Sequence, residues 1–187
     1  RGPGDPNLST ILVGARGTGK TALLSYLAEI ALSRGWVAAS VTAEEGMLED
    51  ILERAAEAGS QFISSGGNAR VTGVSIGQIF EMTWEYEDEG RGNWRTRMNR
   101  LLDELDRYGV GLLITVDEVR ADVDEMIKLA SVYQHFVREG RRVSLVMAGL
   151  PGNVSSLISD DTVSFLRRAF KHRLGRIADY EVEDALR

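Results

Sequence analysis

The chain has 187 residues, of which 43% are hydrophobic and 27% charged, so it is long enough for one folded domain and too apolar for a disordered one. Its formal net charge of -6 argues against a broad nucleic-acid-binding surface, and the absence of cysteine excludes disulfides, thiolate metal sites and a cysteine nucleophile. No apolar run approaches the roughly 18 residues that a membrane span needs, and no signal peptide opens the sequence, so we expect a cytoplasmic location and no membrane partner.

The chain alternates short apolar runs with amphipathic runs. The first apolar run, "STILVG", predicts a buried strand, and the helical spacing of apolar residues after it ends at Gly35. Strands are predicted over 9–14, 36–43, 110–119 and 142–152, and helices over 19–35, 46–59, 94–109 and 122–140. Because the strands are apolar throughout and separated by helices, they predict a parallel sheet that helices cover on both faces.

Two further segments complete the chain. Alternating apolar residues between 69 and 86 predict an inserted, half-exposed β-hairpin rather than a helix. After residue 152 the sequence predicts short helices, a brief strand near 172–177 and the start of another helix. Since the chain begins at Arg1 and stops within an apparent helix, we interpret it as a piece of a longer protein.

A glycine-rich stretch, "GARGTGKT" at residues 14–21, joins the first strand to the first helix. Glycine lets successive backbone N–H groups turn inward around an anion, and the start of a helix adds free N–H groups and a positive dipole end. Lys20 is expected to neutralise the outer phosphates of a nucleotide, and Thr21 to offer its hydroxyl to Mg²⁺. A plain glycine-rich turn is the alternative, but the flanking strand and helix favour a phosphate site. The expected nucleotide-binding residues are Gly14, Ala15, Arg16, Gly17, Thr18, Gly19, Lys20, Thr21 and Ala22.

A second motif, "LLITVDEV", is an apolar strand that ends in Asp117 and Glu118. A carboxylate at the carboxyl end of a central parallel strand faces the crevice where ligands bind. Asp117 is expected to hold the water shell of Mg²⁺ opposite Thr21, and Glu118 to orient and deprotonate the attacking water. A strand followed by a solvated acidic turn would explain this motif alone, but its combination with the glycine-rich loop favours a catalytic role, shared by Glu118 and Lys20.

Together the two motifs resemble those of a known family. "GARGTGKT" is similar to a Walker A motif and "LLITVDE" to a Walker B motif with its glutamate, as in the AAA+ P-loop ATPases and the related signal-transducing STAND ATPases. The segment "SLVMAGLPG" resembles the strand and turn of bacterial members near the origin-recognition-like and transposition-helper branches. The preference for ATP over GTP rests on this resemblance.

The resemblance implies a fold and a domain organisation. We expect a three-layer α/β P-loop NTPase domain over 1–177, with a central, mostly parallel sheet, helices on both faces and the hairpin at 69–86 as an insertion. Residues 178–187 would begin a helical lid that is truncated here. The 142–152 strand would lie in space between the first strand and the strand that ends in Asp117.

The resemblance also implies a polar sensor residue at the end of the 142–152 strand, where it would touch the γ-phosphate. This chain has Ala148, Gly149 and Leu150 there, which departs from the family pattern. Asn153 lies slightly beyond and is the candidate sensor. The alternative is that Asn153 caps the N-terminus of a helix, a position that asparagine favours.

A basic run near the end of the chain has two interpretations. By the resemblance, Arg167 and Arg168 are candidates for an arginine finger that reaches the nucleotide of a neighbouring subunit. The alternative is a basic helix face on an acidic protein, because Lys171, His172 and Arg173 continue the run. This run is also the basic cluster to test as a contact to DNA, which the net charge does not support.

Arg120 directly follows the acidic pair. It is a candidate for monitoring the nucleotide state through Glu118, and the alternative is an ion pair with a nearby acid such as Asp122 or Asp124.

Three functions are consistent with these patterns. The first is ATP binding and Mg²⁺-dependent hydrolysis by the AAA+ type ATPase domain of a larger bacterial protein, weak in isolation, which drives a conformational or assembly switch. The second is a non-hydrolysing ATP-occupancy switch in a STAND-type signalling or transcription regulator. The third, a P-loop kinase or phosphotransferase, is disfavoured by the glutamate directly after Asp117 and by the lack of an arginine-rich acceptor lid. The expected ligands are ATP or ADP and Mg²⁺, with self-association or a partner protein through segments outside this chain.

Overall fold

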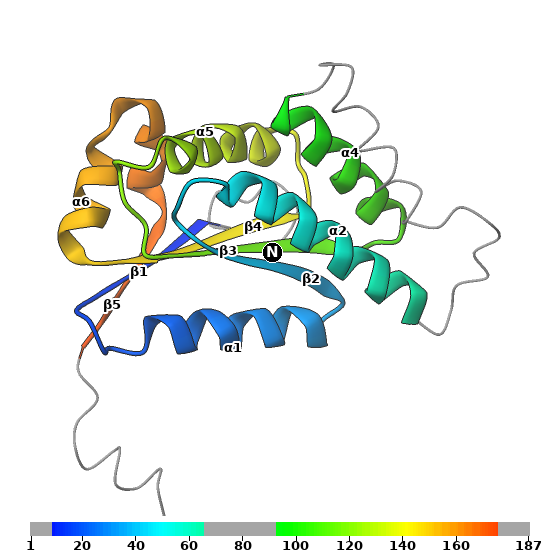
Figure 1. The fold of residues 1–187 in the computed structure, drawn as a ribbon, viewed down its shortest axis with the longest axis horizontal. Helices are drawn as coiled ribbons and strands as arrows, with labels where there is room; N and C mark the ends of the chain where they lie inside the picture. The colour runs from blue at the N-terminus through cyan, green and yellow to red at the C-terminus, as the bar shows by residue number, and fades with distance from the viewer. Residues whose placement is uncertain (1–8, 66–92, 176–187) are drawn as a thin grey trace, which may run out of the picture.

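The computed structural model describes residues 9–65 and 93–175, and it shows a five-stranded, all-parallel sheet in the order β2-β3-β4-β1-β5 (Figure 1). The predicted hairpin at 69–86 and the predicted lid start at 178–187 lie outside the described residues. The strands are β1 Ser9–Gly14, β2 Trp36–Thr42, β3 Gly111–Asp117, β4 Val143–Gly149 and β5 Phe170–Leu174. β4 lies between β1 and β3, which confirms the predicted spatial order, and β5 begins two residues before the predicted brief strand.

Within residues 9–65 and 93–175, five α-helices and a 3-10 helix connect or follow the strands. They are α1 Lys20–Ser33, α2 Met47–Ser65, α4 Trp94–Arg107, α5 Asp124–Arg138, α6 Pro151–Ser159 and η2 Asp161–Arg168. Proline is favoured in the first turn of a helix, so Pro151 and Gly152 begin α6 rather than extend β4 as predicted. Among the helices of the described segments, none is both long and apolar enough to cross a membrane.

The predicted end of the second helix at Gly59 is wrong, because α2 continues to Ser65. Gly59 is buried, and a Cβ there would lie 3.0 Å from Cδ2 of Leu105 on α4. This glycine therefore lets two helices approach closely instead of ending one of them.

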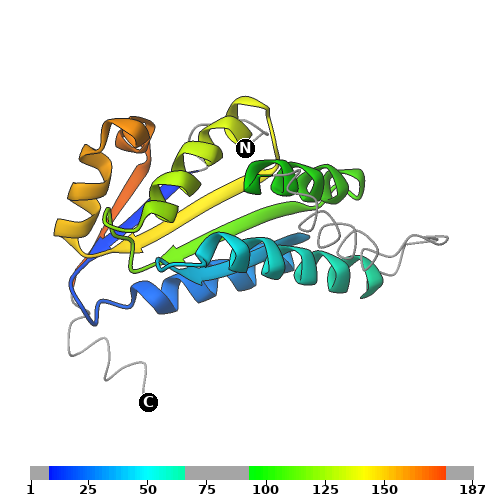
Figure 2. The ribbon, with the colours of Figure 1, turned by 45° about the horizontal axis from the view of Figure 1, so that its top comes forward.

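The helices cover the two faces of the sheet unequally (Figures 1 and 2). α1 lies on one face, while α2, α4, α5, α6 and η2 lie on the other. The two faces alternate along each strand, so Ile11 belongs to the large core under the five helices and Leu12 to a small core under α1. The predicted three-layer α/β architecture is thus confirmed, with most of the buried apolar surface on one side.

The helices of the larger layer are joined by polar contacts around the start of α2. The Trp94 indole, 3% exposed, donates from Nε1 to the Leu48 carbonyl at 2.7 Å. Glu125 of α5 accepts from the Leu48 N–H at 2.9 Å, which satisfies one of the free donors in the first turn of α2. Glu49 forms an ion pair with Arg97 of α4. These contacts hold the N-terminal end of α2, which follows the loop after the carboxyl end of β2.

Candidate nucleotide-binding site

The glycine-rich loop and the acidic pair meet at one edge of the sheet. β1 ends at Gly14 and β3 ends at Asp117, and parallel strands have their carboxyl ends at the same edge. The Thr21 hydroxyl, in the first turn of α1, donates to Oδ2 of Asp117 at 2.5 Å. Two residues that are 96 positions apart in the sequence are therefore in direct contact.

The loop backbone has the geometry of an anion-binding nest. Gly17 and Gly19 have φ values of 76° and 78°, in the left-handed region where a side chain is disfavoured. The backbone N–H groups of residues 16, 17 and 19 make no hydrogen bond within the part of the chain that the structure describes. α1 begins at Lys20, and its N-cap residue Gly19 contributes no side-chain cap. These free donors and the helix N-terminus fit a phosphate chain.

Gly14 is required for a different reason, which is its close contact with β5. A Cβ at this position would lie 2.5 Å from the Thr18 hydroxyl oxygen and 3.0 Å from the Leu174 carbonyl oxygen. Neither atom belongs to the far end of a flexible side chain, so any larger residue would displace the loop from the sheet edge. The contact with Leu174 has no signature in the sequence, because it depends on how β5 pairs with β1.

The Lys20 ammonium lies over the loop. Its Nζ donates to the carbonyls of Gly14 at 3.0 Å and Ala15 at 2.6 Å. An ammonium has three N–H donors, so one of them is available to a phosphate oxygen. The side chain is thus held in place at the nest.

The backbone around the acidic pair is held from both sides. The Asp117 carbonyl accepts from the Ala43 N–H, which follows β2, and the Val119 N–H donates to the Ala148 carbonyl of β4, both at 2.9 Å. Oδ1 of Asp117 accepts from the Glu118 N–H at 2.8 Å. The role of Ala43 could not be found from the sequence, because the contact uses only backbone atoms.

Glu118 has an unusual backbone conformation and a solvent-exposed side chain. Its φ of 52° is the one positive value at a non-glycine residue in the described ranges. Such conformations in non-glycine residues are sparsely populated and concentrate at functional sites. The carboxylate makes no hydrogen bond or ion pair within 9–65 and 93–175, so it is available to a water molecule.

The described residues offer a small set of ligands for a metal. They contain no group of three or more His, Asp or Glu side chains placed to hold an ion. Asp117 and Thr21 supply one carboxylate and one hydroxyl oxygen. This donor set fits Mg²⁺, which usually takes one or two protein oxygens and completes its shell with water and substrate phosphates.

The end of β4 carries no polar side chain. Gly149 is packed so closely that a Cβ would lie 2.7 Å from Cγ2 of Val119 and 3.0 Å from Cγ2 of Val154, which explains why no larger residue stands there. Asn153 is the third residue of α6, whose N-cap is Leu150. The alternative prediction that Asn153 caps this helix is therefore wrong.

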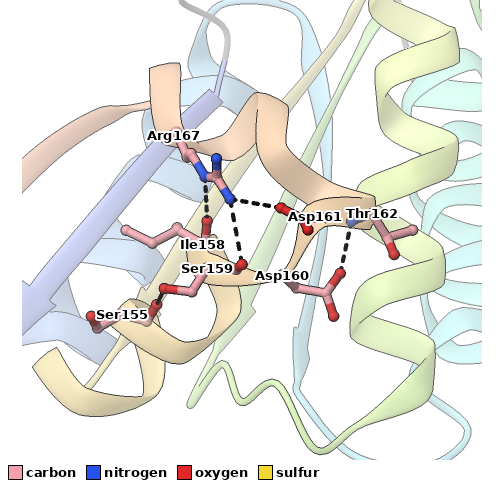
Figure 3. A network of polar contacts seen from close by, with 7 residues as sticks. All are labelled: Ser155, Ile158, Ser159, Asp160, Asp161, Thr162 and Arg167. Atoms are coloured by element: carbon pink, nitrogen blue, oxygen red, sulfur yellow. Dashed lines mark hydrogen bonds and ion pairs between the residues drawn. The ribbon is translucent and has the colours of Figure 1, made fainter.

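The Arg167 side chain contacts the C-terminal end of α6 (Figure 3). Its Nε donates to the Ile158 carbonyl at 3.0 Å, and its Nη2 contacts the Ser159 carbonyl at 3.4 Å and Asp161 Oδ1 at 3.1 Å. These carbonyls are among the last of α6 and have no intrahelical partner, so Arg167 acts as a C-terminal cap.

The other basic residues of the run are exposed. Arg168 ends η2 and has no partner among the described residues, whereas Lys171, His172 and Arg173 lie on β5. The run is therefore divided between a 3-10 helix, which carries Arg167 and Arg168, and an edge strand, so the alternative of a basic helix face does not extend beyond Arg168. Arg120, the further candidate near the acidic pair, forms an ion pair with Asp122 at 3.1 Å.

The strand order and the loop between β1 and α1 give this domain the α/β fold of P-loop NTPases. No family model and no curated protein matches the chain. Among solved structures, the Aeropyrum pernix ORC2 protein, solved in ADPNP–ADP complexes, is similar with a TM-score of 0.59 and 15% identity. Cdc6p from Pyrobaculum aerophilum has a TM-score of 0.55 and 17% identity, and C. elegans PCH-2 has a TM-score of 0.50 and 16% identity.

These similarities cover 95%, 95% and 96% of this chain but only 44%, 41% and 38% of the three solved chains, so it spans less than half of their length. At such identities the similarity shows the fold alone. That fold is the α/β fold of P-loop NTPases, which the motifs implied.

Proposed function

We propose that this domain binds ATP with Mg²⁺ and hydrolyses it. The observation that carries the proposal is the contact between Thr21 and Asp117 beside a loop whose N–H groups are free. The free donors of residues 16, 17 and 19 and the N-terminus of α1 would bind the phosphates, with Lys20 at the outer ones. Thr21 and Asp117 would hold the metal, which when bound stabilises charge on the phosphates.

Glu118 is proposed to be the general base. Its carboxylate is exposed at the same edge of the sheet as Thr21 and Asp117, and its backbone is fixed by the contacts on either side. A carboxylate in this place can orient a water molecule in line with the terminal phosphate and accept its proton. Positioning and electrostatic stabilisation together account for almost all of the catalysis in phosphoryl transfer.

The proposed consequence of the cycle is a conformational or assembly switch in a larger protein. Arg168 is exposed and unpaired in the described part of the chain, whereas Arg167 already caps α6. If two copies associate, Arg168 is therefore the better of the two candidates to reach the nucleotide of a neighbour. Contact of the basic run with DNA stays a proposal that the net charge of -6 does not favour.

A second function, ATP occupancy without hydrolysis, is favoured by the end of β4. Ala148 and Gly149 offer no polar side chain to a γ-phosphate, and the packing around Gly149 leaves no space for one. Asn153 on α6 is the remaining sensor candidate. In this second case, the bound nucleotide would shift a population between two states without being consumed.

The experiment that separates the two functions measures ATP affinity and ATP turnover with Mg²⁺ for the native chain, Glu118→Gln and Lys20→Ala. Glu118→Gln keeps the size of the side chain and removes the base, so turnover should fall by about 10²–10⁴ while ATP still binds. Lys20→Ala should weaken ATP binding itself. Binding without turnover in the native chain would support the occupancy switch, and equal, negligible ATP binding by the native chain and Lys20→Ala would refute both functions.

A further inference from the structure

Thr18 differs from its neighbours in the glycine-rich loop because its side chain is buried. Ala15, Arg16, Gly17 and Gly19 are exposed, whereas Thr18 is only 7% exposed. Its hydroxyl donates to the Ala15 carbonyl at 2.9 Å.

The Ala15 carbonyl is a shared acceptor. It accepts from the Thr18 hydroxyl and, at 2.6 Å, from Nζ of Lys20. A carbonyl oxygen has two lone pairs and can accept both bonds. The side chains of Thr18 and Lys20 are thus linked through one backbone oxygen, without a hydrogen bond between them.

The direction of this carbonyl determines the direction of an N–H group in the nest. The peptide bond between Ala15 and Arg16 is trans, so its C=O and N–H point in opposite directions. Holding the Ala15 carbonyl toward Thr18 and Lys20 therefore turns the Arg16 N–H away from them. The Arg16 N–H belongs to the set that makes no hydrogen bond within the described part of the chain.

We propose that Thr18 is a positioning residue: its hydroxyl orients the Ala15–Arg16 peptide and, through the shared carbonyl, the Lys20 ammonium for the phosphates of a nucleotide. This inference rests on the proposed nucleotide binding and gives the Thr18 side chain a role that acts through the loop backbone. The hydroxyl is the essential group, because the methyl group of Thr18 cannot donate to a carbonyl.

The test compares Thr18→Val, which keeps the shape and removes the hydroxyl, with Thr18→Ser, which keeps the hydroxyl. ATP affinity is measured by titration with a fluorescent ATP analogue, together with thermal unfolding and the amide resonance of Arg16 in isotope-labelled protein. A net hydrogen bond of ordinary strength corresponds to a loss of about three- to tenfold in affinity for Thr18→Val. Thr18→Ser should bind within about twofold of native, since the donor is retained.

A purely structural role would show in different readouts. Losing one hydrogen bond of ordinary strength should lower the thermal midpoint of Thr18→Val by no more than about 6 °C, so this variant remains folded in the binding titration. Its Arg16 amide resonance should shift in the absence of nucleotide, and Thr18→Ser should restore it. If Thr18→Val does not fold, Thr18→Ala is measured against Thr18→Ser instead, because alanine removes the donor without adding a branched side chain.

The outcomes separate this inference from the proposed function. If the native chain binds ATP and Thr18→Val binds it equally well, the positioning role is refuted and the proposed function stands. If valine and serine weaken binding equally, the hydroxyl is not the essential group and the inference is also refuted. If the native chain does not bind ATP, the proposed function itself fails.

Discussion

Replacing Glu118 by asparagine should make the protein more stable than replacing it by glutamine, although both changes remove the same carboxylate. The backbone of Glu118 has a φ of 52°, a conformation that costs an ordinary L-residue about 1–2 kcal/mol. Asparagine occupies this region more readily, because its short side chain bonds to the local backbone, whereas glutamine has no such advantage. We therefore expect Glu118→Asn to exceed Glu118→Gln by about 1 kcal/mol in the free energy of unfolding.

Glycine at the same position separates the two contributions to this difference. It removes the steric cost of the left-handed conformation, but its freedom in the unfolded chain offsets about 0.5–1 kcal/mol of the gain. Glu118→Gly should therefore lie between the glutamine and asparagine variants. For a chain of this length, 1 kcal/mol corresponds to a shift of about 2–4 °C in the thermal midpoint.

The assay is equilibrium unfolding in urea for the three variants and the native chain, with the slope of the transition compared to check that the unfolded states are alike. All three variants lack the proposed base, so ATP turnover should be strongly lowered in each of them, and their stabilities are compared on that common basis. Glu118→Gln serves as the matched control, because it preserves both the length of the side chain and the strained backbone. An asparagine variant no more stable than the glutamine variant would show that the conformation stores no measurable strain.

Three further changes test other contacts. Gly14→Ala places a methyl group 2.5 Å from the Thr18 hydroxyl oxygen, and an overpacking cost of about 1–3 kcal/mol should appear as a roughly five- to hundredfold loss of ATP affinity in a binding titration. Trp94→Phe leaves the Leu48 carbonyl without its indole donor, so the free energy of unfolding in urea should fall by about 1–3 kcal/mol. Burial raises the pKa of Tyr133 to about 12 from 10.0. The contribution of its neutral hydroxyl to stability is therefore complete below pH 10 and is lost as the pH rises toward 12. Tyr133→Phe should abolish this alkaline loss of stability when unfolding is measured against pH.

Each of these three predictions would be contradicted by a specific result. Native ATP affinity in Gly14→Ala would show that the loop can move away from β5 at no cost. A Trp94→Phe protein as stable as native would mean that the bond to Leu48 contributes nothing beyond packing. Parallel loss of stability between pH 10 and 12 in the native and Tyr133→Phe proteins would assign the alkaline transition to other groups.

Much of the site could be predicted from local sequence patterns. Gly17 and Gly19 are fixed by backbone conformation, and Asp117 and Glu118 end an apolar run, so both motifs are visible before any tertiary contact is known. Their meeting at one sheet edge follows from parallel topology alone. The order of the strands came from the family resemblance, because the spacing of apolar residues does not specify which strands are neighbours.

The features that escaped prediction depend on tertiary packing. Gly59 has the appearance of a helix end, but its purpose is the close approach of α2 to α4. Arg167 belongs to a basic run in the sequence, yet the fold places it on the open end of α6. The conformation of Glu118 is imposed by backbone bonds from Ala43 and Ala148, which belong to other strands and loops.

The unequal covering of the sheet has a consequence for local unfolding. Within the described part of the chain, Leu24 is the one buried residue of the 14 in α1, and Tyr26 and Leu32 are 58% and 48% exposed. By contrast, α4 and α5 each bury five residues in the larger core. With one buried residue, α1 is expected to open at a lower free-energy cost than α4 or α5. Because Lys20 and Thr21 belong to α1, a ligand that they bind stabilises this helix by its binding free energy. Amide hydrogen exchange in α1 should then be slower when the site is occupied, so its rate reports occupancy of the site.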